Sequence, residues 1–404
     1  MPDQKIYKLT GKIQPYAWGG KSYIPALLGQ KPSDKPSAEY WLGAHESAPA
    51  EVVGDDVHTT LNKLIIDNPA ETIGDEVGNA FGRLPYLLKV LDVKDMLSIQ
   101  VHPGKLEAEK GFADENERGI PLNDPKRNYK DDNHKPELML ALNEFWLLHG
   151  FKAKDQLTEI LRSVPELEHL APIFEQSGYE GLYRTVMTIS QEKVNSILQP
   201  LLDRIVPLYQ QEKLNRSQED FWAARAALTF SQQSNIDRGI FSIYLLNLVQ
   251  LNKGEAIFQD AGILHAYLEG QNVEIMSNSD NVLRGGLTAK NIDIDELMKH
   301  VLFEPVDPWI IQGTVENGER VYKTPANDFE LSAFELEEGG IASFSTDTTD
   351  ILLVTEGSLK LECGEQQLEL HRGEAAVVFR AQPAQLQAMA DLEVFRASVP
   401  VHNT

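Results

Sequence analysis

The chain has 404 residues, of which 42% are hydrophobic and 24% are charged, and its formal net charge is -24 at pH 7. These values are typical of a soluble globular protein with room for two or three domains. Because nonspecific binding to nucleic acid needs an excess of Lys and Arg, the charge predicts no nucleic-acid partner.

Two further features bear on the cellular setting and on the kinds of metal site available. No apolar run approaches the roughly 20 residues of a membrane-spanning helix, and the N-terminal segment lacks the apolar core of a secretory signal. We therefore expect a cytoplasmic protein with no membrane partner. The single cysteine, Cys363, excludes an internal disulfide and a thiolate-rich cluster, so a metal site would use nitrogen and oxygen ligands.

The first part of the chain, residues 7–151, consists of short segments punctuated by Gly, Pro, Asn and Asp. Residues 86–93 and 138–142 have the composition and length of strands. This part is predicted to be mostly sheet.

The pattern changes to helix over residues 153–231, where apolar residues recur at spacings of three and four. Pro200 interrupts this stripe and predicts a kink or two shorter helices, and Ser217 with Asp220 resembles a capping box. The apolar positions of the stripe are Val194, Ile197, Leu198, Leu201, Leu202, Ile205 and Val206.

The rest of the chain returns to sheet. Residues 240–249, 255–259 and 273–276 are predicted strands, and residues 293–300 are a short predicted helix. From about residue 315 to the end, apolar runs alternate with turn residues, as in antiparallel sandwiches and barrels.

Two segments resemble each other. Residues 254–265, GEAIFQDAGILH, and residues 373–384, GEAAVVFRAQPA, both start a strand with Gly-Glu-Ala, and His265 of the first aligns with Ala384 of the second. This similarity suggests a duplicated β-barrel unit in which one copy retained a ligand, although twelve positions can match by chance.

Four polar residues on or beside predicted strands are candidate metal ligands: Gln100, His102, Glu137 and His265. Gln100 and His102 are two apart, so both side chains point to one face of a strand. Two imidazoles, a carboxylate and an amide form a suitable shell for a divalent metal with open positions. The alternative is that each histidine is an ordinary core or surface residue, which is the commoner case for a single histidine.

A second candidate site lies in residues 274–293, EIMSNSDNVLRGGLTAKNID. Asp280, Arg284 and Lys290 surround a Gly-Gly pair, which suits an anionic ligand that approaches the backbone closely. A run of charges in a loop is, however, usually only solvated.

Two resemblances bring these residues together. Gly254, Gly262 and His265 match the second cupin signature, G-x5-P-x-G-x2-H, with Asp260 at the Pro position. The chain also resembles the type I mannose-6-phosphate isomerases. That match rests on YAWGG at 16–20, AEYWLGAHESAPA at 38–50, LPYLLKVLDVKDMLSIQVHP at 84–103, NHKPEL at 133–138, HAYLEG at 265–270 and SDNVLRGGLTAK at 279–290.

The resemblance implies a mainly β fold with an inserted α-helical domain and two cupin-type jelly-roll β-barrels. We expect a discontinuous catalytic cupin domain, residues 1–152 and 232–312, and a helical domain, residues 153–231. Residues 313–404 would form a C-terminal cupin-like barrel without metal ligands. We expect a monomer.

The resemblance also implies roles for individual residues. Gln100, His102, Glu137 and His265 would bind one Zn²⁺ per chain, and Arg284 would be the active-site arginine. Ala289 departs from the family, in which Pro is common at this position. The residues that would line the sugar and phosphate pocket are Trp18, Lys89, Ser98, Tyr267, Glu274 and Lys290.

The implied reaction interconverts mannose 6-phosphate and fructose 6-phosphate through a cis-enediol, with a small phosphosugar as the partner. Lys135, Asp280, Glu274 and a zinc-bound hydroxide are all chemically possible bases. Our hypothesis is that Lys135 and Asp280 take part in proton transfer, with Arg284 stabilising negative charge.

Two other functions fit part of the pattern. His102, Glu137 and His265 would also suit a non-haem iron cupin oxygenase, which needs two histidines and one carboxylate. A non-catalytic sugar-phosphate sensor would keep the pocket without turnover. We assign no role to His45, which we place near the entrance, or to His134, which is either an acid or base in ring opening or an exposed imidazole.

Overall fold

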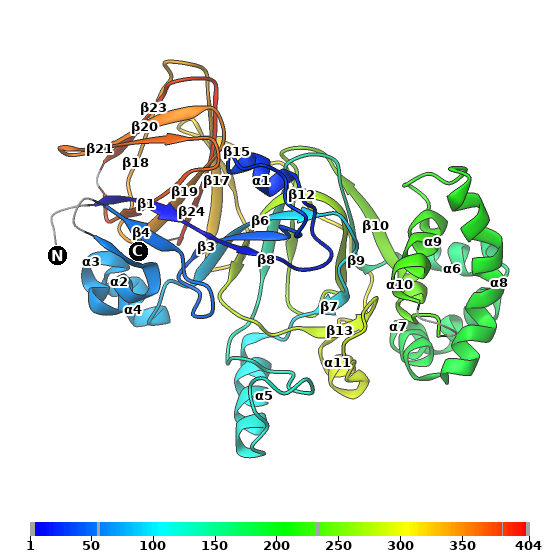
Figure 1. Cartoon of the computed structure of the whole chain (residues 1–404). Coiled ribbons are helices and arrows are strands. Elements are labelled where there is room, and N and C mark those ends of the chain that lie inside the picture. Colours follow the sequence, from blue (N-terminus) through cyan, green and yellow to red (C-terminus); the bar gives the residue numbers. More distant parts are fainter. Residues whose placement is uncertain (1–4, 55–56, 232–234, 382, 401–404) are drawn as a thin grey trace.

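The computed structural model describes residues 5–54, 57–231, 235–381 and 383–400. Strands make up most of the molecule, and a block of helices, α6 to α10, lies to one side of them (Figure 1). This arrangement confirms a sheet-rich fold with an inserted helical segment. No helix among the described residues has the length and apolarity to cross a membrane.

The largest sheet has 11 strands and is centred on β12, His265–Ser277. The first half of β12 pairs with β7 and β9, and the second half pairs with β6 and β8. The change of partners occurs at Gly270, whose φ is 136° and where a Cβ atom would lie 2.8 Å from the carbonyl oxygen of Glu144. The other strands of this sheet are β2 Lys12–Gln14, β3 Glu39–Gly43, β6 Tyr86–Val93, β7 Ile99–Val101, β8 Glu137–Ala141, β9 Phe145–Phe151, β10 Leu246–Leu251, β11 Ala256–Gln259, β13 Leu283–Gly286 and β14 Ile310–Ile311.

The second sheet joins the two ends of the chain. Its order is β15-β16-β17-β24-β19-β22-β1-β4-β5, so three strands from the N-terminal part extend a sheet of C-terminal strands. Its strands are β1 Ile6–Thr10, β4 Glu51–Val53, β5 His58–Thr60, β15 Thr314–Glu316, β16 Glu319–Tyr322, β17 Glu330–Leu336, β19 Thr349–Glu356, β22 Ala375–Phe379 and β24 Leu392–Ser398. A third sheet contains β18 Ile341–Phe344, β23 Ala384–Ala388, β20 Ser358–Cys363 and β21 Gln366–His371.

Helices occupy the margins of the sheets. The helical segment packs on β7 and β9 through a shared apolar core, in which Trp146 and Trp222 have ring centroids 5.9 Å apart. The helices are α1 Tyr23–Leu27, α2 Leu61–Asp67, α3 Pro69–Thr72, α4 Gly74–Phe81, α5 Lys105–Glu117, α6 Lys154–Ser163, α7 Ala171–Thr188, α8 Gln191–Gln210, α9 Glu219–Phe230, α10 Gly239–Leu245 and α11 Ile294–His300, with a 3₁₀ turn at Glu168–Leu170.

Several predicted elements are confirmed. Strand β6 has the predicted bounds, and β8 begins and ends one residue earlier than predicted. Strand β11 covers most of residues 255–259, and residues 273–276 lie inside β12. Helix α11 follows Asp293, whose side chain accepts a hydrogen bond from the backbone N–H of Glu296 and so caps the helix.

Other predictions were wrong. Helix α8 is one continuous helix rather than two shorter ones, because burial of six apolar side chains at about 1.5–3 kcal/mol each outweighs a cost of about 3 kcal/mol for each of its internal prolines, Pro200 and Pro207. The break occurs instead inside α7, at Gly178. The proposed capping box is absent, since α9 begins after Gln218. Residues 240–245, predicted as strand, form helix α10.

Candidate active site and metal centre

Three buried side chains from distant parts of the chain converge on one point. His102 follows β7, Glu137 begins β8 and His265 begins β12. Glu137 Oε1 lies 3.4 Å from His102 Nε2, and Glu137 Oε2 lies 3.4 Å from His265 Nε2. Each residue offers a ligand atom within 4.8 Å of the others. The structure therefore brings together three of the four predicted ligands.

The ring orientations of the two histidines suit metal binding. His102 Nδ1 lies 2.7 Å from the carbonyl oxygen of Asn281, and His265 Nδ1 lies 2.8 Å from that of Ile263. Because a carbonyl only accepts hydrogen bonds, each Nδ1 carries the proton and each Nε2 keeps a lone pair directed at the site. Neither Nε2 atom, nor Oε2 of Glu137, has a hydrogen-bond partner among the described residues. Buried polar atoms without partners are costly, so this donor set fits a divalent cation.

Gln100 lies beside this group. Its position on β7 is directly opposite His265 on β12 and Arg284 on β13. Residues opposite each other in an antiparallel pair share one face of the sheet. Gln100 also lines the adjacent cavity. Its role as the fourth ligand stays a prediction.

The electrostatics keep Glu137 ionised. Burial raises the pKa of this carboxyl, but the cation Lys135 and the neighbouring His102 outweigh burial and hold its pKa well below the usual range. Lys135 Nζ lies 2.7 Å from Glu137 Oε1. Burial, helped by Lys135, lowers the pKa of His102 to about 4, so its imidazole is neutral at pH 7.

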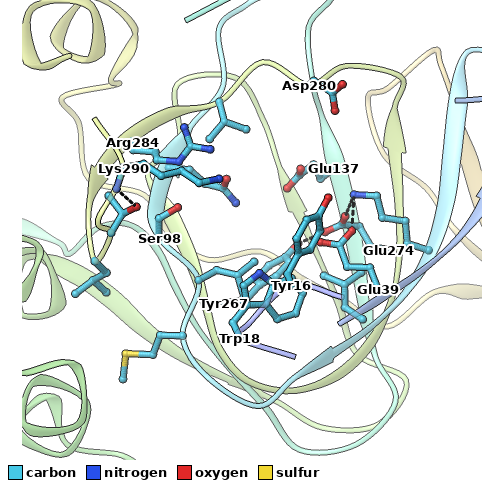
Figure 2. A pocket seen from close by; sticks show the side chains of 18 of the residues that line it. Tyr16, Trp18, Glu39, Ser98, Glu137, Tyr267, Glu274, Asp280, Arg284 and Lys290 are labelled. Atoms are coloured by element: carbon cyan, nitrogen blue, oxygen red, sulfur yellow. Dashed lines mark hydrogen bonds and ion pairs between the residues drawn. The ribbon is translucent and has the colours of Figure 1, made fainter. Parts of the chain in front are cut away.

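A cavity of about 630 Å³ opens next to these residues, and all the other predicted site residues line it. Its two sides differ in charge. Arg284 and Lys290 lie on one side and Glu39 and Glu274 on the opposite side, with Glu137 between them in the view of Figure 2. The cavity therefore presents cations and carboxylates to different ends of one ligand.

The cationic side has the properties of an anion site. The side chains of Arg284 and Lys290 have neither a hydrogen bond nor an ion pair within the described part of the chain. Burial lowers the pKa of both groups, and repulsion from Arg284 and Lys130 adds to the effect at Lys290. A half-buried arginine and an exposed lysine, neither with a counterion among the described residues, favour a ligand that brings negative charge.

The opposite side holds a buried lysine between two carboxylates. Lys89 Nζ lies 3.1 Å from Glu274 Oε1 and 3.5 Å from Glu39 Oε2, and the Tyr267 hydroxyl donates to Glu274 Oε2 at 2.8 Å. Burial alone lowers the pKa of Lys89, but the carboxylates of Glu39 and Glu274 outweigh it and raise the pKa above its usual value. Lys89 is therefore a permanent cation.

The remaining predicted residues lie toward the mouth. Trp18 stacks on Tyr16 with ring centroids 6.0 Å apart, and Ser98 precedes β7. The Asp280 side chain is 53% exposed and pairs with His45 at 3.5 Å. Burial raises the pKa of Asp280, but His45 and the cation Lys135 hold it below its ordinary value. In the view of Figure 2, Asp280 is separated from Glu137, the labelled residue of the metal group.

Sequence reasoning missed several residues of the cavity. Glu39, Trp41 and Tyr16 line it, and Asn281 orients His102 through its backbone carbonyl. Glu39 and Trp41 are alternate residues of β3, so their spacing in the AEYWLGAHESAPA segment carried a usable signal. That segment had served only to establish a family resemblance.

Comparison with known proteins agrees with this site. The family model for the catalytic domain of type I phosphomannose isomerase matches residues 6–154. The mannose-6-phosphate isomerase of Escherichia coli is 37% identical over 383 residues, covering 92% of this chain and 94% of that protein. The chain belongs to the type I phosphomannose isomerase family. Within this family, the mouse mannose-6-phosphate isomerase is 31% identical and covers 98% of this chain and 99% of its own length.

Solved structures of phosphomannose isomerases have the same fold. A mutant phosphomannose isomerase from Salmonella typhimurium superposes with a TM-score of 0.88 at 32% identity, covering 98% of this chain and 100% of that chain. A zinc-bound mannose 6-phosphate isomerase superposes with a TM-score of 0.87 at the same identity and coverage.

Proposed function

We propose that this protein is a metal-dependent aldose-ketose isomerase that interconverts mannose 6-phosphate and fructose 6-phosphate. The observation that carries the proposal is the convergence of His102 Nε2, His265 Nε2 and Glu137 Oε2, which lack hydrogen-bond partners among the described residues. They lie beside a cavity lined by Arg284 and Lys290, whose side chains have no counterion in the described part of the chain. The relatives named above are mannose-6-phosphate isomerases over nearly their whole length.

The metal is Zn²⁺, one per chain, held by His102, Glu137, His265 and Gln100. One carboxylate among three neutral ligands leaves positive charge on the metal, which when bound polarises substrate oxygens and lowers the barrier to enolisation. The structure of a zinc-bound relative supports this choice of metal. Asn281 and Ile263 fix the ring orientation of the two histidines through their carbonyl oxygens.

The substrate is oriented by the two charged sides of the cavity. Lys290, with Ser98, binds the phosphate, because the Lys290 ammonium has no counterion among the described residues. Lys89, Glu274 and Tyr267 bind sugar hydroxyls on the opposite side, since they offer both donors and acceptors. The indole of Trp18 covers the apolar face of the sugar ring.

Proton transfer between C2 and C1 is assigned to Lys135 and Asp280. Lys135 is next to the metal group, where the reacting carbons must lie, and its contact with Glu137 fixes the position of its amine nitrogen. Removal of the C2 proton gives an enediolate, which becomes the cis-enediol when O1 takes up a proton. Return of a proton to C1, with loss of the proton on O2, gives the ketose. Arg284 stabilises the negative charge that develops on oxygen.

A coupled assay tests the proposal. Fructose 6-phosphate formed from mannose 6-phosphate is measured for the purified protein, with and without a chelator, and in air or under nitrogen. We expect turnover that the chelator abolishes, that Zn²⁺ restores and that oxygen does not affect. An oxygen requirement would favour the iron oxygenase, and binding of mannose 6-phosphate without turnover would favour the sensor.

The division of the chain is also a proposal. Residues 1–152 and 232–312 would form a catalytic cupin barrel, residues 153–231 the helical domain and residues 313–404 a second cupin-like barrel. Gly254 and Gly373 support the duplication, since both have a φ of 83° and precede the matching strands β11 and β22. Strand β1 pairs with β22 across this division, and β4 and β5 extend the same sheet beyond β1. The boundary at residue 232 and both chain ends lie outside the described residues.

We further propose a cytoplasmic monomer. The phosphorylated substrate and the single cysteine agree with a reducing intracellular compartment. Light scattering after size-exclusion chromatography tests the oligomeric state, with the chain mass of 45.2 kDa expected for a monomer.

A further inference from the structure

His45 lies at the mouth of the cavity in a fixed orientation. It follows β3, on a turn that the backbone N–H of Ala48 closes onto the His45 carbonyl. Its side chain is only 10% exposed, and its ring meets the ring of Trp41 edge to face with centroids 5.0 Å apart. Trp41 is itself held by a hydrogen bond of 2.5 Å from its indole N–H to Glu39. The imidazole plane is therefore set by a buried strand.

The hydrogen bonds of the His45 ring determine which of its nitrogens carries the proton. The backbone N–H of Ser47 donates to His45 Nδ1 at 3.3 Å, and the Ser47 hydroxyl lies 2.9 Å from the same atom. Because a backbone N–H only donates, Nδ1 is the accepting nitrogen and the ring proton is on Nε2. Nε2 is the atom that faces Asp280, at 3.5 Å from Oδ2.

Asp280 needs such a partner because its own loop fixes only its backbone. The backbone N–H of Asp280 donates to Asp131 Oδ2 at 2.7 Å, and the hydroxyl of Ser279 donates to Asp131 Oδ1 at 2.8 Å. The half-exposed carboxylate of Asp280 forms no hydrogen bond or ion pair other than the one with His45 among the side chains that the structure describes. Without that contact it would be free to turn toward solvent.

We propose that His45 is a positioning residue that holds the Asp280 carboxylate over the mouth of the cavity. Its ring, held by Trp41 and Ser47, directs one N–H donor, on Nε2, toward the Asp280 carboxylate. This inference rests on the proposed part of Asp280 in proton transfer. The segment GAHES, residues 43–47, would then contribute to the reaction through His45 and not only to packing.

The zinc-loaded full-length protein tests this with two substitutions that place an amide differently. The amide nitrogen of glutamine reaches the position of Nε2, whereas that of asparagine reaches only the position of Nδ1. We expect His45→Asn to lower kcat about tenfold, the usual effect of one lost hydrogen bond of about 1.4 kcal/mol, and His45→Gln to restore most of it. Equal losses in both variants would overturn the proposal.

A double substitution separates positioning from general damage. If His45 acts through Asp280, His45→Asn has no further effect on kcat in an Asp280→Asn background, whereas additive losses would contradict the proposal. Full activity of Asp280→Asn alone would also overturn it. His58→Asn is the matched control, because it breaks an exposed histidine–carboxylate pair of 3.7 Å with Glu51, outside the cavity.

Two further measurements keep the test decisive. If Asp280→Asn retains no activity, crystal structures of the His45→Asn and His45→Gln proteins replace the double substitution, and a carboxylate of Asp280 that stays in place in both would overturn the proposal. If the unsubstituted protein does not form fructose 6-phosphate, the proposed isomerase function itself is wrong. The comparisons between variants test the role of His45 only in a protein that is active before substitution.

Discussion

Lys135 lies in direct contact with Glu137, with its ammonium nitrogen 2.7 Å from one carboxylate oxygen, and both side chains are buried. Glu137 is the single anion of the group that fits a divalent metal. Lys135 and a bound metal ion therefore compete for the negative charge of Glu137. Lys135 should therefore have opposite effects on two measurable quantities: it assists proton transfer, and it lowers the affinity of the site for the metal.

Replacement of Lys135 by methionine therefore has opposite effects on binding and turnover. Lys135→Met removes the competing cation, and we expect zinc affinity to rise by about tenfold, or about 1.4 kcal/mol. The same change should abolish exchange of the C2 proton with solvent deuterium, because the amine is lost. Zinc affinity is measured by competition with a chromogenic chelator, and Lys105→Met, which changes a half-exposed lysine outside the cavity, is the control. Weaker zinc binding in Lys135→Met would contradict the expectation.

Zinc should also stabilise the folded protein. The Nε2 atoms of His102 and His265 and one oxygen of Glu137 are buried without partners, and a metal that they bind exclusively in the folded state shifts the unfolding equilibrium. At a free zinc concentration 100 times the dissociation constant, the free energy of unfolding rises by about 2.7 kcal/mol. Urea denaturation with chelated and zinc-loaded protein measures this. An equal gain in Glu137→Gln would show that the metal binds elsewhere.

The cations of the cavity should act mainly on substrate binding. Lys290→Gln removes one charge of the proposed phosphate site, and we expect KM for mannose 6-phosphate to rise about tenfold with a smaller change in kcat. Competitive inhibition by inorganic phosphate should weaken in parallel. Lys299→Gln changes a lysine that pairs with Glu296 on α11 and serves as the control. An unchanged inhibition constant for phosphate in Lys290→Gln would place the phosphate elsewhere.

The elements that could be predicted were those with one dominant local signal. Strand β6 was predicted to the residue, because an apolar run bounded by turn residues has the length of a strand. The same kind of run at residues 240–245 is helix α10, because these side chains pack against the helical segment. Short apolar runs fit both structures, and tertiary packing decides between them.

Prediction of the candidate site was limited by contacts between residues that are far apart in the sequence. Strand alternation placed Gln100 and His102 on one face. Ligand chemistry made Glu137 and His265 candidates for the same metal, but no local pattern indicated that they meet in space. Glu39 and His45 were missed as site residues, since their partners Lys89 and Asp280 are remote in the sequence. No local pattern encodes a contact between a turn after β3 and a loop after β12.

His149 should make stability depend on pH in the absence of metal. Its ring is buried, with Nδ1 2.7 Å from Gln259 Oε1, and burial lowers its pKa to about 4. In the unfolded chain a histidine has a pKa of about 6.5. As the pH falls below about 6.5, the unfolded state takes up a proton that the folded state refuses, so the free energy of unfolding decreases until the pH reaches about 4.

The size of this effect follows from the difference between the two pKa values. At pH 5 the loss from His149 is about 2 kcal/mol relative to pH 7.5, and His102, whose pKa is also about 4, contributes a similar loss. His149→Gln should therefore remove about 2 kcal/mol of the acid destabilisation seen by urea denaturation of chelated protein between these pH values. His58→Gln, which changes an exposed histidine, should leave the dependence unchanged. If His149→Gln keeps the full pH dependence, His149 takes up its proton equally well in the folded state and burial does not hold it neutral.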